Sequence, residues 1–131
     1  MNKQLILVVA LLLVFLPVGK IGSQNKVSGK DTWVKYENNP VLGGGDLGTI
    51  FDISVLKVGD VYKMYCSWRP KRSLALSTST DGKNWTTPQI ILGPNDANEW
   101  EKDLNRPAVV LKDNVYHLWY TGQAKGKSWI G

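Results

Sequence analysis

Short apolar runs alternate with polar positions along most of the chain, and each run closes at Gly, Asn or Asp. No stretch repeats apolar residues three and four positions apart over ten residues, as an amphipathic helix would require. Alternation with a period of two is typical of strands that bury one face and expose the other. The pattern therefore predicts an all-β fold.

Two segments resemble each other at an offset of 54 residues. The sequence VLKVGDVYKMYCSW (residues 55–68) aligns without a gap with VVLKDNVYHLWYTG (residues 109–122). A repeat of about 50 residues is typical of β-propeller blades, which are four-stranded sheets that need neighbours on both faces. We therefore expect a first blade over about residues 50–95 and part of a second over about residues 104–131.

Turn residues divide each repeat unit into strands. Gly59-Asp60 and Asp113-Asn114 suit tight two-residue hairpins. The predicted strands are about 52–58, 61–68, 73–79 and 89–93 in the first unit, and 106–111 and 115–121 in the second. A propeller closes with at least four blades, so we expect the chain to be the N-terminal portion of a longer protein. The alternative is a complete small β-sandwich.

The first 23 residues have the layout of a secretory signal peptide. Lys3 precedes an apolar run over residues 5–18, and small residues follow it up to a plausible cleavage site near Ser23. An uncleaved membrane anchor is the alternative, but the run is shorter than the ~20 apolar residues of a spanning helix. We expect a secreted or periplasmic protein, not bound to a membrane after cleavage, that begins with a polar linker over residues 24–35.

The charge and cysteine content exclude several classes of partner. The formal net charge is +5, and it falls to +3 when the two lysines of the predicted signal peptide are removed. The remaining lysines are scattered without a basic run, which argues against nucleic acid as a partner. Cys66 is the only cysteine, so no intrachain disulfide or thiolate zinc cluster can form. It lies in an apolar alternation, and we expect it in the core.

Three segments resemble a known group of enzymes. The segments NNPVL (residues 38–42), FDISVLKVGDVYKMYCSW (51–68) and NRPAVVLKDNVYHLWYTGQ (105–123) are similar to the opening blades of five-bladed β-propeller glycoside hydrolases, the group around families 43, 32 and 130. The resemblance covers about residues 33–131, so residues 36–131 would be the N-terminal part of such a propeller. It implies hydrolysis of O-glycosyl bonds in oligo- or polysaccharides. We expect no cofactor, and no spacing of His, Cys or carboxylate residues supports a metal site.

The resemblance implies a role for Asp52, a carboxylate in an otherwise apolar run. In the family, an Asp at the matching place on the innermost strand of the first blade is the general base. Glycoside hydrolysis needs a second carboxyl group as the acid, and the family takes its acid Glu and a further Asp from later blades. We therefore expect the chain to be inactive alone. A carboxylate that caps a strand end remains an alternative for Asp52, as does a non-catalytic carbohydrate-binding or structural module for the protein.

Other residues are candidates for substrate contact. Arg106 is the counterpart of Asp52 at the offset of 54, where it could keep Asp52 ionised, clamp sugar hydroxyls or form a purely structural ion pair. Trp68, Arg69 and Trp100 suit sugars because an indole stacks on a pyranose and a guanidinium bonds hydroxyls, although most tryptophans must be core. The acidic segment NEWEKD is interpreted as a solvated loop, with Asp103 its best site candidate.

The segment STDGKNW, by contrast, is interpreted as structural. It is similar to the turn between the outer strands of propeller blades. Asp81 can accept backbone N–H bonds, Gly82 can take positive φ, and Trp85 can pack on the blade. We expect no ligand at this turn.

Overall fold

The computed structural model describes residues 33–131, and residues 35–131 form one compact unit. The predicted signal peptide (residues 1–23) and most of the predicted linker (24–35) lie outside the described residues. Within the described part, no helix is long and apolar enough to cross a membrane.

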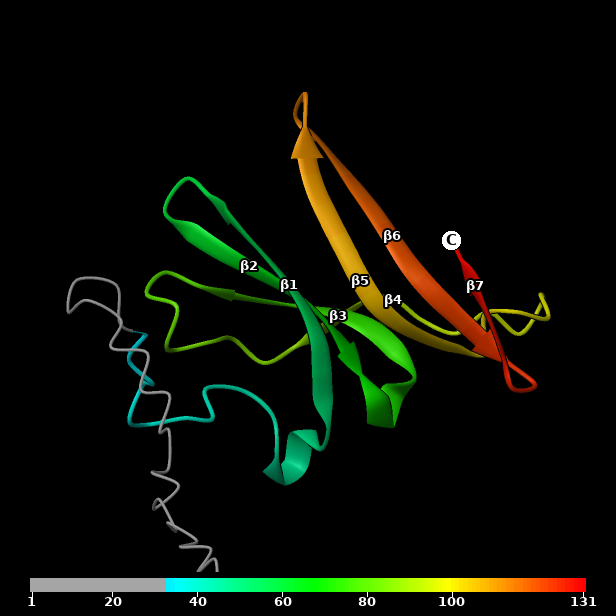
Figure 1. The fold of residues 1–131 in the computed structure, drawn as a ribbon, viewed down its shortest axis with the longest axis horizontal. Coiled ribbons are helices and arrows are strands. Elements are labelled where there is room, and N and C mark those ends of the chain that lie inside the picture. Colours follow the sequence, from blue (N-terminus) through cyan, green and yellow to red (C-terminus); the bar gives the residue numbers. More distant parts are fainter. Residues whose placement is uncertain (1–32) are drawn as a thin grey trace, which may run out of the picture. The chain divides into compact units, whose positions relative to one another are not determined.

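The strands form two antiparallel sheets (Figure 1). The first sheet has the order β1-β2-β3-β4 and the second β5-β6-β7. Two short 3-10 helices, η1 (Gly45–Leu47) and η2 (Arg69–Lys71), precede β1 and follow β2. The strands are β1 (Ile50–Val58), β2 (Val61–Trp68), β3 (Ser73–Ser79), β4 (Gln89–Leu92), β5 (Asp103–Lys112), β6 (Val115–Ala124) and β7 (Lys127–Ile130). The prediction of an all-β fold is confirmed for residues 33–131.

Both predicted hairpin turns are present. Gly59 has a φ of 58° in the turn that joins β1 to β2. Asp113 and Asn114 both have positive φ, 50° and 63°, between β5 and β6. Two-residue turns with this backbone twist match the twist of the flanking strands. These turns set the register of the first two strands in each sheet.

Two strands begin earlier than predicted. β1 begins at Ile50 and β5 at Asp103, so Asp52 and Arg106 lie inside their strands and are not the entry residues that the sequence predicted. Asp103, which was expected in a loop, is the first residue of β5. The alternation of apolar and polar side chains is interrupted near the start of both strands. The sequence pattern therefore predicted later starts than the structure has.

The core lies around β2 and β3 and at the start of β5. Leu74 and Cys66 have no exposed surface and Leu104 is 1% exposed. The prediction that Cys66 is a core residue is thus confirmed. Burial raises the pKa of its thiol to about 11, so the thiol stays protonated near neutral pH.

The second sheet packs against one face of the first, with β5 in contact with β1, β2 and β3. Two serines of the first sheet accept hydrogen bonds across this contact. The backbone N–H of Val109 donates to Ser54 Oγ at 3.2 Å, and that of Arg106 donates to Ser67 Oγ at 2.9 Å. Backbone groups of β5 that make no ladder bond are thereby satisfied.

The STDGKNW turn has the structural role that was predicted. Asp81 Oδ1 accepts the backbone N–H groups of Lys83 and Asn84 at 2.8 Å each. Gly82 has a φ of 72°, and its carbonyl accepts the indole N–H of Trp85 at 3.1 Å. These bonds hold the connection between β3 and β4 in one conformation.

We expect Asp81→Ala to destabilise the fold at pH 7 and to have less effect at pH 3. The backbone bonds from Asn84 and Lys83 hold the pKa of Asp81 well below its usual range. A carboxyl group whose pKa is depressed by folding stabilises the native state above its unfolded pKa, near 4, and loses that contribution as the pH falls. Urea denaturation of both proteins at pH 7 and pH 3 measures this. Asp60→Ala, which removes a carboxylate with no side-chain hydrogen bond to the described residues, is the control. An equal difference at both pH values would contradict the prediction.

Candidate functional site

The structure brings together the two residues that the sequence repeat relates. Asp52 Oδ2 lies 3.9 Å from Arg106 Nε across the contact between β1 and β5. The two side chains are 31% and 59% exposed, respectively. An ion pair with this much exposure contributes at most about 1 kcal/mol to stability. The pair is therefore accessible to a ligand and does little to hold the sheets together.

Both residues lie in β-bulges. The pairing of β1 with β2 shifts between Phe51 and Ser54, and that of β5 with β6 shifts between Asn105 and Ala108. A bulge re-aims a side chain out of the regular alternation of a strand. The same irregularity thus occurs at the same place in both repeat units.

The backbone at these bulges is strained. Asp52 has a φ of 48° and Arg106 a φ of 55°. The left-handed region costs of order 1–3 kcal/mol for a residue other than glycine, and such residues concentrate at binding and catalytic sites. Asp enters this region more readily than most residues, whereas Arg has no such preference. The surrounding contacts must impose the conformation of Arg106.

One carboxylate oxygen at the site is unpaired. Asp52 Oδ2 is almost inaccessible, and no hydrogen bond from the described residues reaches it. A separation of 3.9 Å from Arg106 Nε is too long for a hydrogen bond. A buried acceptor without a donor costs about 1–3 kcal/mol. This oxygen is closed to solvent, so a ligand would meet Asp52 at the exposed part of its side chain, which is 31% exposed as a whole.

Trp68 and Arg69 lie at the same end of the first sheet as Asp52. Trp68 pairs with Ile50 at the start of β1, and its indole N–H donates to the carbonyl of Leu47 at 2.8 Å. The guanidinium of Arg69 lies 5.2 Å from the ring centroid of Phe51, the residue before Asp52. The hydrogen bond to Leu47 thus holds the Trp68 side chain in place, and Arg69 is an exposed cation at this edge.

Trp100 belongs to a different group of residues, on the second sheet. Its ring stacks on Tyr120 with a centroid distance of 5.8 Å and an interplanar angle of 15°. Glu101, the next residue, is only 8% exposed and accepts hydrogen bonds from the Tyr120 hydroxyl and the Asn98 amide. The interpretation of this acidic segment as wholly solvated is therefore wrong for Glu101.

The buried Glu101 is a structural carboxylate that the sequence analysis missed. The bond from Tyr120 holds its pKa below the usual range, while burial and Glu101 raise the pKa of Tyr120 to about 12. Glu101 thus remains ionised and Tyr120 protonated at neutral pH. Their separation of 19 residues leaves no local signal in the sequence.

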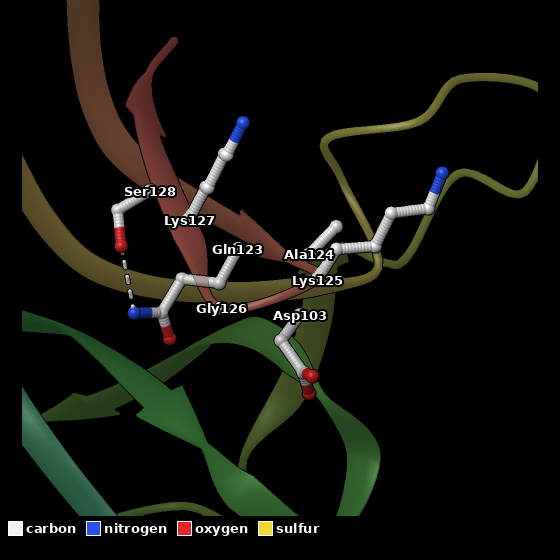
Figure 2. A pocket seen from close by; sticks show the side chains of 7 residues that line it. All are labelled: Asp103, Gln123, Ala124, Lys125, Gly126, Lys127 and Ser128. Carbon is white, nitrogen blue, oxygen red and sulfur yellow. Dashed lines mark hydrogen bonds between the residues drawn. The ribbon is translucent and has the colours of Figure 1, made fainter.

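Asp103 lines a pocket of about 280 Å³ at the hairpin between β6 and β7 (Figure 2). The other lining residues are Gln123, Ala124, Lys125, Gly126, Lys127 and Ser128. Figure 2 shows the Asp103 carboxylate and the Lys127 ammonium pointing in opposite directions. Gln123 Nε2 donates to Ser128 Oγ at 3.0 Å. Asp103 is therefore a pocket residue without a charged partner in the described part of the chain.

Residues 33–131 contain no group of three His, Cys, Asp or Glu side chains that could hold a metal ion together. At the two bulges, the groups available for chemistry are the carboxylate of Asp52 and the guanidinium of Arg106. A carboxylate accepts from hydroxyl groups and a guanidinium donates to them, so the pair suits a polyhydroxylated ligand.

The chain has an all-β fold similar to that of glycoside hydrolases. A solved structure titled "Glycoside hydrolase" is 27% identical with a TM-score of 0.59, over 76% of this chain and 31% of its own. A second, whose title names a complex of BT0996 and RGII, matches with the same identity, coverage and TM-score. The chain thus spans about a third of the length of these structures. No protein-family model matches it, and no curated protein does.

Proposed function

We propose that the chain is part of a secreted glycoside hydrolase that cleaves O-glycosyl bonds in oligo- or polysaccharides. The observation that carries the proposal is the partly exposed carboxylate of Asp52, which faces Arg106 at the equivalent bulge of the neighbouring sheet. The similarity to a glycoside hydrolase supports it. Secretion follows from the predicted signal peptide over residues 1–23.

In this proposal Asp52 is the general base. Its carboxylate accepts a proton from water as the water attacks the anomeric carbon and the glycosidic bond breaks. Arg106 donates to sugar hydroxyls and balances the charge of the carboxylate. The acid that protonates the leaving oxygen is a second carboxyl group, which we assign to the part of the enzyme that corresponds to the remaining length of the similar structures.

We also propose that the two sheets are successive blades of a five-bladed propeller. The face of the first sheet that the second sheet covers includes Leu56, Val61, Lys63 and Tyr65. Their counterparts at the offset of 54 form an outer stripe on the second sheet: Val110, Val115, His117 and Trp119. Val110, Val115 and Trp119 are 51%, 55% and 49% exposed, whereas Tyr65 is 8% exposed. A third sheet that packs on the second sheet, as the second packs on the first, would cover the outer stripe.

The contact between the two sheets also includes a polar interaction, and a third sheet would make the equivalent interaction with the second. Lys63 Nζ donates to the Tyr116 hydroxyl at 2.8 Å and lies 4.7 Å from the centre of its ring. His117 occupies the position of Lys63 in the second sheet. We therefore propose that His117 meets an aromatic hydroxyl of the next blade.

The test is a screen of the complete gene product against a panel of plant and microbial oligosaccharides, with products separated by anion-exchange chromatography. We expect release of sugars from at least one glycan. Binding without release would favour a non-catalytic carbohydrate-binding module, and the absence of both would overturn the proposal.

A further inference from the structure

We infer that a second pocket, on the β6–β7 hairpin, binds an acidic sugar unit, a uronate, of the glycan. This inference rests on the proposed carbohydrate function and specifies the substrate class. The pocket has a volume of about 450 Å³ and is lined by Glu99, Trp100, Lys125, Lys127 and Trp129. Pockets of this size hold small ligands. We call it the Trp129 pocket.

The aromatic wall of the Trp129 pocket is rigid. Trp100 stacks on Tyr120, and the backbone N–H of Trp100 donates to Asn98 Oδ1 at 3.2 Å. A Cβ placed on Gly122 would lie 2.4 Å from Cε3 of Trp100, so the ring rests directly on the backbone of β6. A ring fixed in this way loses little conformational entropy when a ligand binds.

Trp129 adds a second indole to the same face of the sheet. It pairs with Gly122 across β6 and β7, so its side chain projects on the side that Trp100 covers. It is 39% exposed, which leaves surface for a ligand. Two indoles that line one pocket suit the apolar face of a pyranose ring.

The charges of the Trp129 pocket favour an anion. Lys125 Nζ lies 3.3 Å from Glu99 Oε2, but the two side chains are 76% and 89% exposed, so the pair is weak. Lys127 forms no ion pair with any residue of the described part of the chain. The pocket thus has two ammonium groups and one carboxylate. Lys127 is free to pair with the carboxylate of a bound uronate.

The neighbouring pockets indicate how a glycan would continue from the Trp129 pocket. The pocket of Figure 2 shares Lys125 and Lys127 with it and extends to Asp103. Asp103 precedes Arg106 by three residues in β5, about 10 Å along an extended strand. The two pockets thus lead from the hairpin toward the start of β5, and the inference places the acidic unit at the hairpin end.

The test compares the affinity of the purified protein for oligogalacturonides with that for their carboxyl-reduced counterparts, by titration calorimetry. These ligands differ only in the carboxylate. We expect the acidic form to bind about tenfold more tightly at low salt, as a charge-assisted bond provides, and the difference to shrink at 0.5 M NaCl. Indole N–H signals of Trp100 and Trp129 should shift on binding in ¹H–¹⁵N spectra.

Matched variants locate the effect. Lys127→Gln should abolish the preference for the acidic form, and Lys112→Gln, the same change at the hairpin between β5 and β6, should leave it intact. Trp129→Ala should weaken both forms, with the fold checked by circular dichroism.

Three results would overturn the inference. They are equal affinity for the acidic and neutral forms, an unchanged preference in Lys127→Gln, or inorganic phosphate competing for the pocket as well as the acidic glycan does. In each case binding or hydrolysis of neutral glycans would leave the proposed function intact. If glycans of neither kind bind and none is hydrolysed, the proposed function fails as well.

Discussion

Asp52→Asn is expected to lower the rate of glycan hydrolysis by the complete gene product about 100-fold to 10,000-fold, the range for loss of a general base. An amide has the shape of the carboxylate but cannot take a proton from water. Asn also accepts the left-handed backbone at least as readily as Asp, and the φ of 48° at this position is then no obstacle to folding. The turnover number and the affinity for substrate are the quantities to measure.

The matched control is Asp60→Asn, an isosteric change in the turn at the other end of β1. It should leave turnover unchanged, and both variants should unfold at a denaturant concentration close to that of wild type. Turnover in Asp52→Asn within a few-fold of wild type would rule out Asp52 as the base. A large loss of affinity with unchanged turnover would make Asp52 a substrate-binding residue.

The strands and turns of this chain are predictable from local sequence. β2 and β3 have the bounds that alternation predicted, and the two hairpins turn at Gly59-Asp60 and Asp113-Asn114. The alternation of side chains and the residue types of a turn are local properties, so a short stretch of sequence is enough to predict a strand or a hairpin. The repeat at the offset of 54 also predicted that Asp52 and Arg106 would be equivalent, and the structure places them in contact.

The bulges at Asp52 and Arg106 could not be predicted in the same way. A bulge depends on how two strands pair, and the residue types alone are poor predictors of positive φ, because Asp has only a weak preference for it and Arg has none. The same limit applies to Glu101, whose burial depends on Tyr120 and Asn98. The parts of the site that sequence analysis missed are therefore contacts between distant residues.

The repeat and the bulges together explain why an acidic and a basic residue meet at this place. Each sheet re-aims one side chain at the equivalent position of its first strand, and the packing of β5 on β1 brings the two positions close together. The first unit supplies a carboxylate and the second a guanidinium. In a propeller, further sheets would direct further side chains toward the same place, which is how repeated blades can build one site from different residues.

The other large effect is expected from Gly122→Ala, which should destabilise the fold by about 1–3 kcal/mol. A Cβ at Gly122 would lie 2.4 Å from Cε3 and 2.8 Å from the backbone oxygen of Trp100. The overlap with backbone means that a change of rotamer cannot relieve it. Urea denaturation of the variant and wild type gives the difference in free energy of unfolding.

A double-mutant cycle with Trp100 separates this overlap from other causes. In a Trp100→Ala background, Gly122→Ala should cost less, because the overlap with the ring is absent and only the overlap with the backbone oxygen at position 100 remains. Gly93→Ala is the control for added side-chain volume, since its nearest neighbour, Ser73 Oγ, would be 3.8 Å away, an ordinary contact. An equal cost of Gly122→Ala in both backgrounds would show that the Trp100 ring does not rest on β6. The rigid wall inferred for the Trp129 pocket would then lose its main support.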